Sequence, residues 1–236
     1  LSIDSATKTL KVKELATVKV FEDTYDKLIL ATGANAWVPP IVGADLPHVF
    51  TLRKMADMDR IVAFIASTKP KTAAIIGTGF VGLECAENFS RLGMKVTMIE
   101  KLPHVTPGMD EDMARMIQEH LEEKQVQVFV DAGIAAIEPN KVRLEDGTLI
   151  DADLVLVSTG IKPEVGLAKA AGVVLGPTGA ISVTTSMETS IKDIYACGDC
   201  IEQYHLITGK PVWRPLGSTA NKTGRIAGDV ASGGDL

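Results

Sequence analysis

The sequence TAAIIGTGFVGLE, residues 72–84, decides the fold. It begins with a short, mostly apolar run of the kind that forms a strand buried in the middle of a parallel sheet. Three glycines follow at G-x-G-x-x-G spacing, and apolar residues then recur at helical spacing over residues 80–92, where Gly93 ends the pattern. A strand, a glycine turn and a helix in this order predict the first part of a dinucleotide-binding domain.

Each glycine of this turn has a separate physical task. Gly77 permits the tight turn, Gly79 lets a pyrophosphate approach the backbone, and Gly82 lets the helix pack close to the strand. The helix start then offers free amides and a partial positive charge to phosphates. The predicted cofactor-binding segment is Gly77, Thr78, Gly79, Phe80, Val81 and Gly82. A glycine turn in another kind of α/β protein is the alternative interpretation.

The second predicted strand, residues 95–100, ends in an acidic residue. Glu100 follows Gly77 by 23 positions, near the roughly 20 expected for an acid that accepts hydrogen bonds from a ribose 2′-hydroxyl. A carboxylate there repels a 2′-phosphate, so NAD(H) is favoured over NADP(H). Lys101 comes next and would partly relieve that repulsion, so it joins the predicted binding residues.

A turn is repeated on either side of this region. The runs LILATG (28–33) and LVLVSTG (154–160) are both an apolar strand that ends in Thr-Gly. The repetition predicts two related domains, one inserted into the other. We therefore expect an α/β protein with a Rossmann-like domain, a parallel sheet with a β-meander, at residues 49–180. The partial flanking domain would consist of residues 1–48 and 181–236.

Composition narrows the function classes. The 236 residues carry a net charge of −6 and are 46% hydrophobic, which is typical of a globular domain and not of a partner for nucleic acids or anionic membranes. No apolar run is long enough to predict a membrane span. Three cysteines fit a reducing cytoplasm better than a disulfide scaffold, and the four scattered histidines lack the spacing of metal ligands.

Five motifs together resemble one protein family. They are LILATG, GTGFVGLE (77–84), VSTG (157–160), IYACGD (194–199) and RPLGSTANKTGRIAGDVASG (214–233). The chain resembles the FAD-dependent pyridine nucleotide–disulfide oxidoreductases, in the branch of NADH oxidases and coenzyme A-disulfide reductases. This resemblance implies passage of a hydride from NADH to FAD, and of electrons onward to a disulfide, oxygen or another acceptor.

The resemblance also implies residue roles. Phe80 stands where many relatives have a tyrosine that covers the flavin, although it could instead be a packed core aromatic. Glu84 matches an acid that pairs with a lysine near the flavin in relatives, so Phe80 and Glu84 are the expected catalytic residues. Cofactor contacts are expected from Thr32, Gly33, Thr159, Gly160, Gly198, Asp199, Leu216 and Gly217.

The sequence departs from the family at three points. No glycine fingerprint for FAD and no redox cysteine precede Gly77, and no dimerisation domain follows. We therefore expect a central piece of a longer protein, with an NAD(P)-binding domain (49–180) inserted into a partial FAD-binding domain (1–48 and 181–236) of the two-dinucleotide-binding flavoprotein type. The parent would be a homodimer. The alternative is a non-catalytic NAD(H)-binding module; a methyltransferase would not explain IYACGD. Cys197 and Cys200 have the spacing of a thiol redox pair, with simple packing as the other reading.

Overall fold

The chain folds into two compact units. The computed structural model describes residues 1–234; unit 1 consists of residues 1–35 with the chain from 162 onward, and unit 2 of residues 36–161. These bounds differ from the predicted 48/49 and 180/181. Val42 bridges to Ala136 of unit 2, while Ala168 and Val173 pack in the core of unit 1. Local sequence does not reveal such long-range packing.

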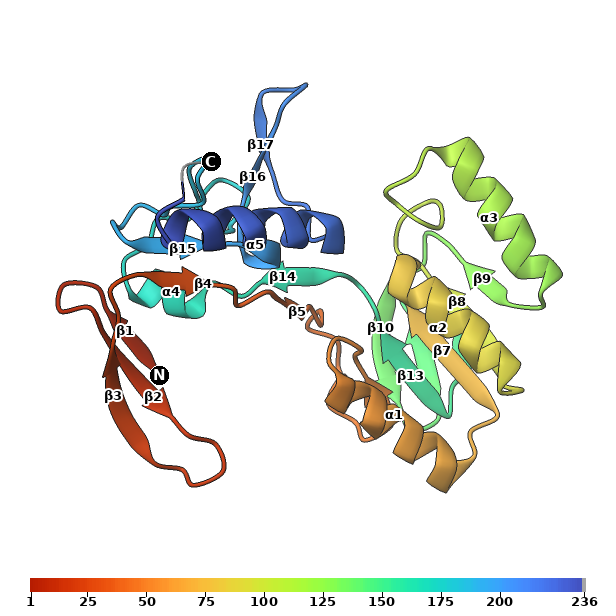
Figure 1. Ribbon diagram of the computed structural model, residues 1–236. Helices are drawn as coiled ribbons and strands as arrows, with labels where there is room; N and C mark the ends of the chain where they lie inside the picture. The colour runs from red at the N-terminus through yellow and green to blue at the C-terminus, as the bar shows by residue number, and fades with distance from the viewer. Residues whose placement is uncertain (235–236) are drawn as a thin grey trace. The chain divides into compact units, whose positions relative to one another are not determined.

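Unit 2 is built on a five-stranded sheet in the order β6-β13-β7-β8-β9, and its strands are parallel (Figure 1). The strands are β6 (Val49–Phe50), β7 (Thr72–Ile76), β8 (Lys95–Ile99), β9 (Gln127–Phe129) and β13 (Leu154–Val157). Because both faces are covered, β7, β8 and β13 are almost entirely buried.

Helices cover one face of this sheet and a meander covers the other. The helices are α1 (Met55–Thr68), α2 (Phe80–Arg91) and α3 (Glu111–Glu123). Ile75 packs with Phe89 of α2, whereas its neighbour Ile76 packs with Val142 of the meander. The meander strands are β10 (Ile134–Glu138), β11 (Lys141–Leu144) and β12 (Leu149–Asp151). The predicted Rossmann-like sheet with a β-meander is therefore present.

Unit 1 brings an early and a late segment of the chain together. Strand β4 (Leu28–Leu30) pairs in parallel with β15 (Ile194–Ala196), and α5 (Gly217–Ala231) shares their core. An antiparallel meander, a short helix, a 3-10 turn and a hairpin complete the unit. These elements are β1 (Ser2–Asp4), β2 (Thr9–Lys13), β3 (Val20–Thr24), α4 (Gly166–Ala170), η1 (Gly198–Cys200), β16 (Gln203–His205) and β17 (Lys210–Val212).

The chain passes between the units twice. The two passages are β5 (Ala34–Ala36) and β14 (Ile161–Pro163), and they pair with each other. Within the described residues, no helix combines the length and the apolar character that a membrane crossing requires.

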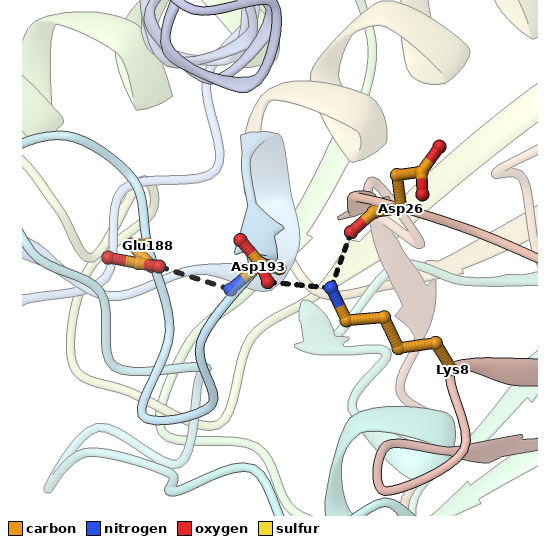
Figure 2. A network of polar contacts seen from close by, with 4 residues as sticks. All are labelled: Lys8, Asp26, Glu188 and Asp193. Atoms are coloured by element: carbon orange, nitrogen blue, oxygen red, sulfur yellow. Dashed lines mark hydrogen bonds and ion pairs between the residues drawn. The ribbon is translucent and has the colours of Figure 1, made fainter.

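A polar network ties the first strands of unit 1 to the segment before β15 (Figure 2). The Lys8 ammonium donates to Asp193 Oδ2 at 2.6 Å and to the Asp26 carbonyl at 2.9 Å. The Asp193 amide in turn donates to Glu188 Oε1 at 3.1 Å. The ion pair raises the pKa of Lys8 and lowers the pKa of Asp193. The network joins Lys8 to Asp193, 185 positions later, so it holds the first strands of the chain against the segment before β15.

Candidate functional site

Contacts from the end of β8 and from the turn after β13 hold the glycine turn that follows β7. Gly77 has φ +97°, a value that L side chains rarely adopt. A Cβ at this position would lie 2.6 Å from the Ser158 carbonyl oxygen. The Gly77 amide donates to the Ile99 carbonyl at 2.8 Å. Gly77 is therefore required both by its backbone conformation and by the contact between β7 and the turn that follows β13.

The other two glycines differ from each other. A Cβ on Gly82 would lie 2.4 Å from the Gly77 carbonyl oxygen and 2.9 Å from Ser158 Oγ, so α2 can approach the strand only with glycine there. No heavy atom lies within 4 Å of the Cβ position on Gly79. Nothing in the folded protein itself requires glycine at residue 79, and the space beside it is open to a ligand.

The start of α2, next to this open space, has backbone amides that no capping side chain accepts. Gly79 is the N-cap and has no side chain to accept the first amides, which leaves them for an anion. Phe80 and Val81 begin the helix with exposed side chains, 66% and 42%. The reading of Phe80 as a packed core aromatic is therefore wrong. Glu84, one turn further, is also exposed.

Glu100 lies buried beside the same turn, with 7% of its surface exposed. Its Oε2 accepts hydrogen bonds from the Thr78 amide at 3.1 Å and from Thr78 Oγ1 at 2.8 Å. Its Oε1 accepts from the Leu102 amide at 3.0 Å. The carboxylate is thus held by three donors, and the lone pairs of Oε1 still have capacity for a ligand hydroxyl.

A cavity of about 530 Å³ joins these groups within unit 2. Glycine turn, acid, lysine and Thr-Gly turn all lie on its wall, although they come from distant parts of the sequence. The lining residues are Trp37, Pro39, Ile41, Ile76, Gly77, Thr78, Gly79, Ile99, Glu100, Lys101, Leu102, Pro107, Ala132, Gly133, Ile134, Glu145, Ser158, Thr159 and Gly160. The size and the mixed apolar and polar wall suit a nucleotide-sized ligand.

Some of this wall was not predicted from the sequence. Trp37 lines the cavity, and its carbonyl accepts a hydrogen bond from Thr159 Oγ1 at 2.8 Å. Glu145 lies against Gly133, where a Cβ would overlap its carboxylate at 2.3 Å from Oε2. Neither residue belongs to a local motif. The only available signal was Gly133, because a glycine between strands often marks a close approach.

The predicted residues of unit 1 gather at the ends of two neighbouring strands. Leu30 of β4 pairs with Ala196 of β15 in parallel register, so the turn with Thr32 and Gly33 and the turn with Gly198 and Asp199 lie at the same sheet edge. The remaining two are Leu216, the N-cap of α5, and Gly217, its first residue.

Hydrogen bonds hold these turns in place. The Gly198 amide donates to Thr223 Oγ1 of α5 at 3.1 Å, and Thr32 Oγ1 donates to the Glu164 carbonyl at 2.5 Å. Gly33 and Gly198 have φ of +71° and +79°. These conformations explain glycine at both turns, and α5 joins the second turn to the core of the unit.

The cysteines are packed inside the protein. Cys197 and Cys200 are buried, and burial raises the pKa of the Cys197 thiol. Cys200 Sγ donates to the Cys197 carbonyl at 3.2 Å. Burial also raises the pKa of Cys85 to about 11. Thiols in such surroundings are poor nucleophiles, which favours packing over a redox role. Across residues 1–234, no three metal-ligating side chains cluster together.

Comparison with known proteins gives one consistent family. The profile described as pyridine nucleotide-disulphide oxidoreductase matches residues 1–215. An NADH oxidase of Methanocaldococcus jannaschii is 39% identical over 218 residues, which cover 90% of this chain and 48% of that protein. A CoA-dependent NAD(P)H sulfur oxidoreductase of Pyrococcus furiosus is 38% identical over 239 residues, which cover 99% of this chain and 53% of that protein.

A solved structure agrees with these sequence matches. The structure of an NAD-dependent persulfide reductase from A. fulgidus matches with a TM-score of 0.95 at 38% identity, over 100% of this chain and 44% of that one. The chain spans about half the length of the curated relatives it matches.

Proposed function

The chain belongs to the pyridine nucleotide-disulphide oxidoreductase family, and on that premise we propose that unit 2 binds NAD(H). In the whole protein, NADH would deliver a hydride to FAD, and electrons would pass on to a disulfide, oxygen or another acceptor. The single observation that carries the proposal is the cavity of unit 2, which unites the glycine turn, the start of α2, Glu100 and the Thr159–Gly160 turn.

The residues of the cavity suit NAD(H) group by group. The pyrophosphate would lie against the free amides at the start of α2, where the open space beside Gly79 gives it room. The adenosine ribose would donate a hydroxyl to Glu100 Oε1. Thr159 and Gly160 would line the path toward the nicotinamide.

Selection of NAD(H) over NADP(H) would rest on charge. Glu100 and Glu145 place two carboxylates on the cavity wall, and Lys101 supplies one ammonium. A 2′-phosphate brought to Glu100 would meet like charge close to the ribose. Lys101 is exposed, so solvent weakens the attraction it can offer in return.

FAD would be held by the strand ends of unit 1. The Thr32–Gly33 and Gly198–Asp199 turns lie at one sheet edge. At the start of α5, which follows Leu216, a Cβ on Gly217 would meet no atom within 4 Å. Asp199 would hold the ribityl chain. When bound, FAD supplies the acceptor for the hydride.

Phe80 and Glu84 remain the proposed catalytic residues. The exposed Phe80 ring is free to stack on an aromatic cofactor ring, and Glu84 is exposed on the same helix. The whole protein is further proposed to act as a homodimer in the cytoplasm, a setting that suits three unpaired cysteines.

A second function fits the residues of unit 2 taken alone. The cavity is formed entirely by residues between Trp37 and Gly160, so the proposed binding of NAD(H) would not require a flavin. The chain by itself would then be a nucleotide-binding module without turnover.

Titration of the purified chain separates the two functions. NADH and NADPH are each titrated against the chain and against Glu100→Ala, and FAD is measured after purification. We expect NADH to bind more tightly, and Glu100→Ala to weaken NADH by about 1–2 kcal/mol and to reduce discrimination. Preferential NADPH binding by the unmodified chain would contradict the role of Glu100. Stoichiometric FAD with NADH turnover favours the enzyme, whereas NADH binding without FAD favours the module.

A further inference from the structure

We propose that Thr78 is a positioning residue, which fixes the carboxylate of Glu100 and through it selects NAD(H) against NADP(H). This inference rests on the proposed binding of NAD(H) in unit 2 and deepens it. Thr78 occupies a variable position of the glycine pattern, between Gly77 and Gly79, and its side chain is fully buried. Thr78 is among the residues that line the cavity, but its hydroxyl is directed to Glu100 Oε2 inside the protein.

The hydroxyl of Thr78 has only one orientation that satisfies its neighbours. The Thr106 amide donates to Thr78 Oγ1 at 3.1 Å, so this oxygen already serves as an acceptor. Its single proton is left to donate, and Glu100 Oε2 lies 2.8 Å away. An ionised carboxylate can only accept. The order of donation is thus fixed: the amide of Thr106, the hydroxyl of Thr78, the carboxylate of Glu100.

This chain of hydrogen bonds restrains the acid. The amide and hydroxyl of Thr78 both donate to Oε2, and the Leu102 amide holds Oε1. Rotation of the carboxylate would break at least one bond to a group that is itself buried, which is costly because the donor would be left unsatisfied. Glu100 is consequently held in place before any ligand arrives.

The segment after Glu100 is shaped to supply this support. Thr106 has φ +48°, an uncommon conformation for a β-branched residue. Its own hydroxyl is buried and has no hydrogen-bond partner, whereas its amide is used by Thr78. Because Thr106 is strained and its hydroxyl makes no hydrogen bond, we infer that the backbone path matters here more than the side chain.

Fixing the acid has a consequence for cofactor choice. A carboxylate that cannot turn away keeps its negative charge at the ribose position, so a 2′-phosphate meets full repulsion while a 2′-hydroxyl finds an acceptor already in place. Without the Thr78 hydroxyl, only the amides of Thr78 and Leu102 still hold Glu100, so the carboxylate is restrained less firmly and can shift when a phosphate approaches. Loss of that hydroxyl should therefore act chiefly on discrimination.

The test compares variants of residue 78 in the full chain. Thr78→Val removes the hydroxyl at nearly constant volume, Thr78→Ser restores it, and Thr97→Val is a matched control because Thr97 is also buried and lies on β8. Dissociation constants for NADH and NADPH are measured by fluorescence titration, with thermal melting as the check on folding. We expect Thr78→Val to lower the NADH:NADPH preference by about tenfold, the loss of one hydrogen bond to a charged group. Thr78→Ser and Thr97→Val should leave it unchanged.

Each other result decides the proposal. The proposal is overturned if a folded Thr78→Val protein keeps the NADH:NADPH preference of the unmodified chain. It is also overturned if Thr78→Ser lowers that preference as much as Thr78→Val does. If Thr78→Val does not fold, Thr78→Ala must show the same loss of preference. A chain that binds neither nucleotide refutes the proposed function as well. If Glu100→Gln lowers the NADH:NADPH preference but substitutions of residue 78 do not, only the role of Thr78 is refuted.

Discussion

Both units set a Thr-Gly turn beside a glycine turn at the end of two parallel strands, but the two pairs of turns are supported differently. In unit 2 the turn after β13 supports Gly77, because the Ser158 carbonyl fills the space of the missing Cβ at 2.6 Å. In unit 1 the turns follow β4 and β15, and a Cβ on Gly198 would meet its nearest neighbour, the Ala220 Cβ, at an ordinary 3.7 Å.

The difference lies in what surrounds the turns. The pair in unit 2 belongs to a five-stranded sheet with a meander on one face, and these elements supply the walls of the cavity. The pair in unit 1 belongs to a two-stranded pair, where Ile29 is still 39% exposed. The same local turn therefore lies in two different surroundings, a wide covered sheet in unit 2 and a partly exposed strand pair in unit 1.

The largest effect is expected from a substitution that disrupts the supported turn at Gly77. Gly77→Ala combines an unfavourable φ with a clash against backbone, so we expect a loss of about 3–5 kcal/mol in the free energy of unfolding of unit 2. Gly198→Ala, with a positive φ but no clash, should cost unit 1 about 1–2 kcal/mol. Urea unfolding followed by tryptophan fluorescence measures both in single-tryptophan proteins: with Trp213→Phe the remaining Trp37 reports on unit 2, and with Trp37→Phe the remaining Trp213 reports on unit 1. Equal losses would contradict the proposed difference in support.

A smaller effect separates ligand binding from folding. Gly79 has open space beside it and an ordinary backbone conformation, so Gly79→Ala should leave the midpoint of urea unfolding unchanged. The added methyl group would stand where the pyrophosphate approaches, and NADH affinity should fall about tenfold, or 1.4 kcal/mol. Gly217→Ala, at an equally open position in unit 1, is the matched control and should not alter NADH affinity. Unchanged NADH binding by Gly79→Ala would place the pyrophosphate elsewhere.

The smallest effect concerns the response of the two units to acid. Burial lowers the pKa of His48 in unit 2 below its usual 6.5, so the unfolded chain takes up a proton first and stability falls as pH drops below 6.5. In unit 1, Lys8 lowers the pKa of Asp193 below its usual 3.8, so that contribution persists until pH falls below about 4. Unit 2 should therefore weaken first between pH 6.5 and 5.

A single substitution checks the source of this acid response. His48→Gln removes the titrating group, and the urea midpoint reported by Trp37 should then change less between pH 7 and pH 5. The midpoint reported by Trp213 should be the same in both proteins. A pH dependence that survives in His48→Gln would mean that another group in unit 2 controls it.

Much of unit 2 was predictable from local sequence. The strand, turn and helix over residues 72–91 follow from hydrophobic period and glycine spacing, and Glu100 follows from its distance along the chain. Thr159 and Gly160 were expected from the resemblance of VSTG (157–160) to a family motif. The bounds of the units were not, because whether residues 37–48 pack with Ala136 or elsewhere depends on contacts far apart in sequence.

The amino-acid sequence by itself determined which elements form and the order in which they follow, because strand and helix periods and turn residues act over a few positions. Tertiary structure alone decided that Trp37 and Glu145 join the cavity wall, that Phe80 is exposed, and that Thr78 turns inward to hold Glu100. Those outcomes depend on how a sheet, a meander and a loop close around one another. No local pattern records them.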